Sequence, residues 1–167
     1  MPVKYTDQEI AALIVERKPL PHDYRTRIQL REKQGHKERE LDVRGENGNE
    51  FRLILRQSSF NPLDFSIILA VLPLDTHQPF RLKRYNGKSH EHTNHIEGNT
   101  FYDFHIHIAT ERYQEIGIRE DAYAEPTENF ADFHSAIRCM INECAFALPK
   151  NDQLSLFEEM RHGNKSD

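Results

Sequence analysis

Histidines are concentrated in one stretch of the chain. Five of the ten fall between residues 80 and 110, and His105 and His107 alternate there with apolar residues, preceded at the same spacing by Asp103. On a β-strand this spacing places the three side chains on one face, with successive Cα atoms on that face roughly 6 to 7 Å apart. Imidazole and carboxylate groups at such distances can bind a metal ion or transfer protons. We therefore expect Asp103, His105 and His107 to form the centre of a functional site.

The polar loop before this strand supplies further candidate metal ligands. These are His90, His92 and Glu97. One of them would complete a metal site with His105 and His107, and a divalent metal such as zinc suits this set of nitrogen and oxygen donors. The alternative is a solvated loop that binds no metal.

A metal-free phosphodiesterase or nuclease would use the same histidines differently. His105 and His107 would act as general base and acid, assisted by Asp103 and Arg112. Basic residues that can bind phosphate are Arg52, Arg56, Arg81, Lys83 and Arg84. Alternatively, these cations pair with acidic residues on neighbouring strands. The sequence thus leaves a small hydrolase or nuclease, metal-dependent or not, as one hypothesis.

The charge distribution is uneven along the chain. The net charge is -5, yet residues 17–56 contain eleven Lys or Arg against seven Asp or Glu, and residues 111–167 contain six against twelve. A basic segment of this kind can bind phosphate groups or nucleic acid, and it can equally pair with acidic residues of the same molecule.

The elements that position these residues follow from the apolar periodicity. Residues 7–17 and 130–148 show helical spacing, whereas 25–33, 36–44, 51–55, 80–85 and 101–109 alternate with period two. In 63–72, apolar residues occupy positions of both parities, as expected of a strand covered on both faces. These patterns predict an α+β fold: a twisted, mainly antiparallel sheet of about six strands, packed on one face by a long C-terminal helix and a short N-terminal helix. We expect one domain over residues 1–149 and a tail over 150–167.

The same alternation predicts which side chains lie on each face of the sheet. Apolar side chains turn toward the helices, so the opposite face gathers Arg27, Arg31, Arg52, Arg56, Asp103, His105 and His107. That face, where it meets the 86–100 loop, is the predicted working surface, and its ligand should be anionic.

The tail contains a second functional signal, the pentapeptide Gln153, Leu154, Ser155, Leu156 and Phe157. It resembles the peptide with which many bacterial replication and repair proteins bind the DNA polymerase sliding clamp. The resemblance implies that Gln153 hydrogen-bonds in a polar pocket of the clamp, while Leu156 and Phe157 fill an apolar cleft with Leu154 beside them. It predicts a bacterial or phage replication or repair accessory protein. The alternative is that the tail folds back on its own domain.

The remaining expectations concern the compartment and the globular part. No apolar stretch approaches the roughly 20 residues that span a bilayer, and the first ten residues lack an apolar signal core, so we expect a cytoplasmic protein that is not membrane-bound. The blocks RYNGKSHEHTN and FYDFHIH resemble a bacterial family without assigned function. A non-catalytic inhibitory or structural partner protein is the third hypothesis.

Overall fold

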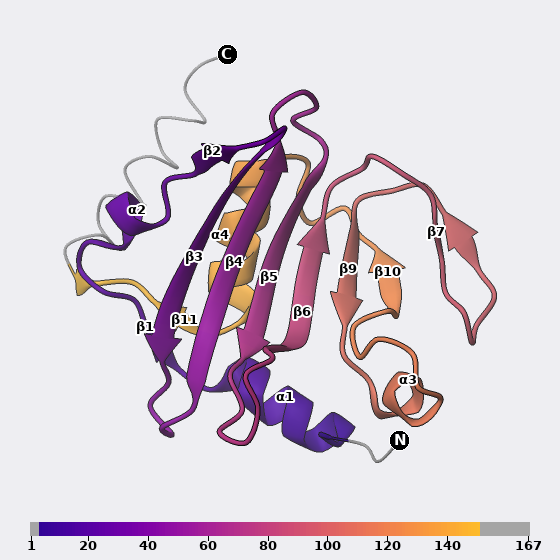
Figure 1. Cartoon of the computed structure of the whole chain (residues 1–167), viewed down its shortest axis with the longest axis horizontal. Helices are drawn as coiled ribbons and strands as arrows, with labels where there is room; N and C mark the ends of the chain where they lie inside the picture. Colours follow the sequence, from indigo (N-terminus) through magenta and orange to yellow (C-terminus); the bar gives the residue numbers. More distant parts are fainter. Residues whose placement is uncertain (1–3, 151–167) are drawn as a thin grey trace.

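A seven-stranded antiparallel sheet forms the centre of the protein (Figure 1). A computed structural model describes residues 4–150. The strands are β2 (Arg31–Lys33), β3 (His36–Arg44), β4 (Glu50–Ser58), β5 (Phe65–Val71), β6 (Phe80–Asn86), β9 (His105–Ile108) and β10 (Ala124–Pro126). Their order across the sheet is β10-β9-β6-β5-β4-β3-β2. The predicted α+β class with a mainly antiparallel sheet is confirmed.

Two small strand pairs lie outside this sheet. β7 (His92–Thr93) and β8 (Thr100–Phe101) form an antiparallel hairpin in the loop that precedes β9. β1 (Lys18–Pro19) pairs in parallel with β11 (Phe146–Ala147), which brings the N-terminal and C-terminal parts of the described chain together.

Helices cover one face of the sheet. Figure 1 shows α4 (Phe133–Glu143) behind the strands and α1 (Asp7–Val15) along the lower ends of β5 and β6. Both helices contribute buried residues to the core, among them Leu13 and Met140. α1 begins with a capping box, in which the Thr6 side chain accepts from the amide of Glu9 and the Glu9 side chain accepts from the amide of Thr6. α4 begins with a capping box formed by Asp132 and Ser135, and it starts later than the predicted helical range 130–148.

Two regions differ from the sequence prediction. Residues 25–33 do not form one strand: α2 (Tyr24–Arg27) is a short helix, and the strand pairing is confined to β2. Arg27 therefore does not lie on a strand. Near the C-terminus, α3 (Glu111–Glu115) and β10 were not predicted, because elements of five and three residues are too short to show a period.

The register of the central strands separates apolar from charged side chains. Leu41 pairs with Leu53 and Val43 with Phe51, and all four are buried in the core beneath the helices. The intervening Asp42 lies opposite Arg52. Charged side chains of β3 and β4 thus lie on the face opposite the helices, as alternation requires.

A buried lysine joins the two ends of the described chain. The Lys18 side chain is fully buried, and its Nζ lies 2.7 to 3.0 Å from the backbone oxygens of Leu13, Ile14, Glu16 and Cys144, which share its three N–H donors. It also lies 4.5 Å from the centre of the Phe51 ring. Carbonyl groups at the C-terminal ends of α1 and α4 have no hydrogen-bond partner within their own helix. The Lys18 ammonium group therefore caps both helices.

Replacing Lys18 by methionine should therefore destabilise the protein strongly. The substitution keeps the apolar stem but leaves four buried carbonyl groups without their donor, and we expect the free energy of unfolding to fall by about 3 kcal/mol or more. Urea unfolding at neutral pH measures this loss. Lys33→Met, which alters an exposed lysine, should change the stability by less than about 0.5 kcal/mol. Equal effects of the two substitutions would contradict the capping role.

Candidate metal centre

Two histidines of β9 face away from the helices, and backbone groups orient both rings. Nδ1 of His105 lies 2.8 Å from the carbonyl oxygen of Asp103, and Nδ1 of His107 lies 2.8 Å from that of Asp121. A carbonyl oxygen can only accept a hydrogen bond, so each Nδ1 carries the proton and each Nε2 keeps its lone pair. This backbone support is typical of histidines that ligate metals.

The β7–β8 hairpin brings the third histidine over this strand. Asn94, fully buried, pairs with Ala124 of β10 through two hydrogen bonds: Nδ2 donates to the Ala124 oxygen at 2.8 Å, and Oδ1 accepts from its amide at 2.9 Å. The same Oδ1 lies 2.9 Å from Nε2 of His92. Since Oδ1 only accepts, Nε2 of His92 donates, and its Nδ1 keeps a lone pair.

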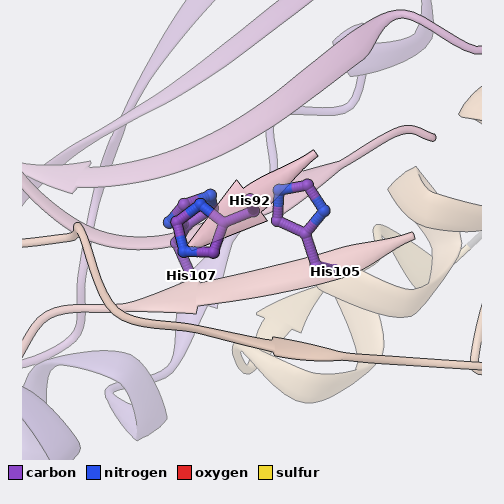
Figure 2. Close-up of side chains that lie close together, drawn as sticks. All are labelled: His92, His105 and His107. Carbon is purple, nitrogen blue, oxygen red and sulfur yellow. The ribbon is translucent and has the colours of Figure 1, made fainter. Parts of the chain in front are cut away.

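The three histidines form a compact group, which we call the His92/His105/His107 cluster. Figure 2 shows the three rings close together beside β9. Each ring offers one nitrogen, and the three nitrogens lie within 4.8 Å of one another. A tetrahedral zinc site needs separations of roughly 3.4 Å between ligand atoms, so small side-chain rotations would close the group around an ion.

Burial keeps two of these rings in the form that binds metals. His105 and His107 are buried. Burial lowers the pKa of His105 to about 4 and, together with the nearby Arg84 guanidinium, lowers that of His107 to about 2. Nε2 of His105 is also buried and has no hydrogen-bond partner among residues 4–150. A neutral buried imidazole with an unused lone pair is the state that a cation needs.

A polar cavity of about 390 Å³ opens beside His92 and His107. Its other lining residues include Ser66, Arg84, Asn86, His90, His95 and Arg119. Behind it lies Asp121, whose fully buried carboxylate faces three guanidinium groups at 3.0 to 3.7 Å, those of Arg81, Arg84 and Arg119. Glu120 pairs with Arg81, so this group of three cations and two anions carries a net positive charge. Two of its guanidinium groups, those of Arg84 and Arg119, line the cavity.

The structure places the predicted site residues in several different environments. It brings His92, His105 and His107 together, with the His90 ring 6.2 Å from that of His105 between centroids. Glu97 lies elsewhere, because its carboxylate pairs with Arg112 and with the hydroxyl of Tyr113. Glu97, a predicted metal ligand, therefore pairs with Arg112 of the predicted catalytic set and is not part of the group of three histidines.

The remaining predicted site residues do not all lie at the His92/His105/His107 cluster. The carboxylate of Asp103 is not part of the cluster, and this residue contributes its backbone oxygen. Arg52 pairs with Asp42, and Arg56 with Glu38. The Lys83 ammonium lies over the ring of Tyr85, which stacks on Phe130 in the core. Of the predicted phosphate-binding set, Arg81 and Arg84 contact Asp121, and Arg84 lines the cavity.

Sequence reasoning missed three residues that build this region. Asn94 sits in a stretch of polar residues that looks like a solvated loop, and Asp121 and Arg119 follow a short helix without a recognisable motif. Their roles depend on contacts between distant segments. The spacing of Asn94, two residues after His92, was the one local signal for it.

One comparison with known proteins places the chain in a family. A model described as a family of unknown function (DUF6978) matches residues 5–147. The chain belongs to this family. The matched range contains the whole His92/His105/His107 cluster and ends before Gln153. No curated protein and no solved structure matched the chain significantly.

Within residues 4–150 of this DUF6978 member, no helix combines the length and the apolar character needed to cross a bilayer.

Acidification should destabilise the metal-free protein through the buried histidines. Their pKa values in the folded state lie below the ordinary value near 6.5, so the unfolded chain takes up these protons first. Stability is therefore lost as the pH falls below about 6.5, down to about 4 for His105 and about 2 for His107. Near pH 4.5 the loss should be on the order of 2 to 3 kcal/mol for each histidine.

His105→Gln isolates one part of this effect, because glutamine does not titrate. Urea unfolding in the presence of a chelator should show that the stability advantage of the wild type over this variant shrinks by on the order of 2 to 3 kcal/mol between about pH 7 and pH 4.5. A constant difference across that range would contradict the assignment.

Proposed function

We propose that this protein is a metal-dependent hydrolase of phosphate esters, with His92, His105 and His107 as the ligands of a zinc ion. The observation that carries the proposal is the convergence of three histidines from two separate elements, two of them buried, neutral and oriented by backbone oxygens. One ring nitrogen from each of the three histidines lies within 4.8 Å of the others, and the Nε2 of His105 has no hydrogen-bond partner among residues 4–150. A metal ion therefore suits this group better than an anion does.

Three histidine ligands leave one position of a tetrahedral site open. A zinc ion in such a site supplies a bound water that ionises near neutral pH and can attack a phosphorus or carbonyl centre. His107 lies at the boundary between the cluster and the cavity, so a substrate in the cavity would lie next to the open position.

The cavity wall favours a phosphate group over a neutral substrate. Arg84 and Arg119 both line the cavity, and both are oriented by the buried Asp121 carboxylate. Fixed guanidinium groups match the oxygens of a phosphate and stabilise the negative charge that develops during its hydrolysis. Asn86, which accepts a hydrogen bond from Ser66, adds a neutral amide next to His107. We therefore assign the substrate to the phosphodiester class, nucleic acid included.

Removal of two ligands tests the proposal directly. Protein purified without a histidine tag should contain about one zinc ion per chain by elemental mass spectrometry, and it should hydrolyse bis(p-nitrophenyl) phosphate or single-stranded nucleic acid. His105→Ala/His107→Ala should lose the metal and reduce turnover to the background rate. His77→Ala, which alters an exposed histidine distant in sequence from the cluster, is the matched control and should change neither.

A further variant separates metal binding from substrate binding. Arg119→Gln removes a partly exposed guanidinium of the cavity and none of the ligands, so the zinc content should persist while KM for the phosphodiester rises. Metal without any hydrolysis would favour a non-catalytic binding or structural protein. Neither metal nor histidine-dependent hydrolysis would rule out the proposed enzyme.

The second proposal is that the protein docks on the DNA polymerase sliding clamp. It rests on the pentapeptide Gln153 to Phe157, which lies outside the described residues. A short apolar peptide beyond a folded domain is a common way to deliver that domain to a partner, and the clamp would bring a phosphodiesterase to DNA.

Clamp docking predicts a specific loss of affinity. Leu156→Ala/Phe157→Ala removes the two apolar anchors of the motif, and the affinity for purified clamp should fall by about 100-fold or more in a calorimetric titration. Glu158→Ala/Glu159→Ala changes two adjacent charged residues as a control and should have a much smaller effect. Equal affinity of the wild type and the Leu156/Phe157 variant would exclude this mode of docking.

A further inference from the structure

A large groove lies between residues 24–32 and helix α4, away from the histidine cluster. Its volume is about 810 Å³. Its apolar lining residues are Ile28, Leu30, Phe133, Ile137 and Ile141. Ile28, Leu30 and Ile137 are half-buried: they pack against the core and also border this space. We call this feature the α4 groove. Apolar side chains that line a groove of this size are characteristic of a site for an apolar peptide segment.

The rim of the α4 groove has a definite charge. Arg25, Lys37 and Arg138 line it together with one acidic residue, Glu32. An apolar floor with a mainly basic rim favours a ligand that is apolar in its centre and acidic at its ends.

The described chain ends close to one end of this groove. Ala147 of β11 pairs with Pro19 of β1, and its oxygen accepts from the amide of Leu20. The chain continues from β1 to α2, whose first residue, Tyr24, lines the groove. Figure 1 shows the end of the described chain on the same side of the molecule as α2. The described chain therefore ends on the side of the molecule where the groove begins.

The following segment has the composition that the groove requires. Residues 152–159 contain three acidic residues and no basic residue, and their apolar side chains are Leu154, Leu156 and Phe157. Leu154 follows Lys150 by four residues, so even this first apolar residue can reach roughly 13 Å beyond the described end. Because the segment is tethered, its effective concentration at a nearby site is in the millimolar range, and weak contacts suffice for docking.

We propose that residues 152–159 of the chain dock in its own α4 groove, with Leu154, Leu156 and Phe157 on the apolar floor and the acidic residues at the basic rim. This contact would be autoinhibitory. It uses the side chains with which the tail would bind the sliding clamp, so self-docking and clamp docking exclude each other. That consequence rests on the clamp proposal, whereas self-docking does not.

A single tryptophan can report on this contact, because the sequence contains none. In full-length Phe157→Trp, the emission should be shifted to shorter wavelength relative to the urea-unfolded chain and should be independent of protein concentration. Adding Ile137→Ser/Arg138→Glu should return the emission to that of a solvent-exposed indole. Adding Asn142→Glu, on the same helix but not in the groove lining, should leave it unchanged. Circular dichroism should show that each variant is folded.

If the double substitution unfolds the protein, Arg138→Glu alone provides the test. This substitution alters an exposed side chain, and it should still shift the emission partly toward that of a solvent-exposed indole. An indole that is solvent-exposed in the full-length reporter, or that does not respond to either groove variant, would overturn the proposal. A blue shift that appears only at high protein concentration would also overturn it, because the occupant would then be the tail of a second copy.

Titration with purified clamp distinguishes self-docking of the tail from docking on the sliding clamp. If both hold, Arg138→Glu should bind the clamp several-fold more tightly than the wild type, because the tail no longer has to leave the groove. If the tryptophan responds to the groove variants but no variant binds the clamp, self-docking stands and the clamp proposal fails. If the clamp binds all groove variants equally and the tryptophan does not respond, the clamp proposal stands and self-docking fails.

Discussion

The His92/His105/His107 cluster depends on the side chain of Asn94, which forms hydrogen bonds of the kind that the backbone of a neighbouring strand would form. The amide of Asn94 forms the pair of hydrogen bonds with Ala124 that another strand would form with the free edge of β10. It thereby fixes the β7–β8 hairpin over the sheet and holds His92 above β9. A hairpin of two short strands is barely stable alone in water. The position of His92 thus depends on the hydrogen bonds between Asn94 and Ala124 at the edge of the sheet.

The second constraint is that Asp121 contacts both a histidine of the cluster and the arginines beside the cavity. Its backbone oxygen orients His107, and its carboxylate gathers three arginines. A buried carboxylate requires compensation, and two of the guanidinium groups that provide it, those of Arg84 and Arg119, line the same cavity as His92 and His107. Ligand orientation and cavity charge are therefore coupled: a change at Asp121 would alter both.

The sheet strands were the most predictable part of the fold. Residues 36–44 and 51–55 alternate over enough positions to fix both strand and face, and the same parity placed His105 and His107 away from the helices. The short strand β10 gave no such signal, and the apparent alternation of residues 25–33 was misleading, because residues up to Arg27 belong to the helix α2. Spacing predicted the histidines as candidates, because neighbouring positions on a strand must lie close together. The sequence could not show that Glu97 pairs with Arg112, since that choice depends on how the hairpin folds over the sheet.

The buried Lys18 has a consequence for synthesis of the protein. Its partner Cys144 is 126 residues further along the chain, and the β1–β11 pairing spans nearly the same distance. While the chain emerges from the ribosome, the lysine must remain hydrated, because the carbonyl groups of α4 do not yet exist. Domains generally fold as units once their sequence is available. The domain should therefore complete its folding after translation has passed residue 147, and truncated nascent chains should remain dependent on chaperones.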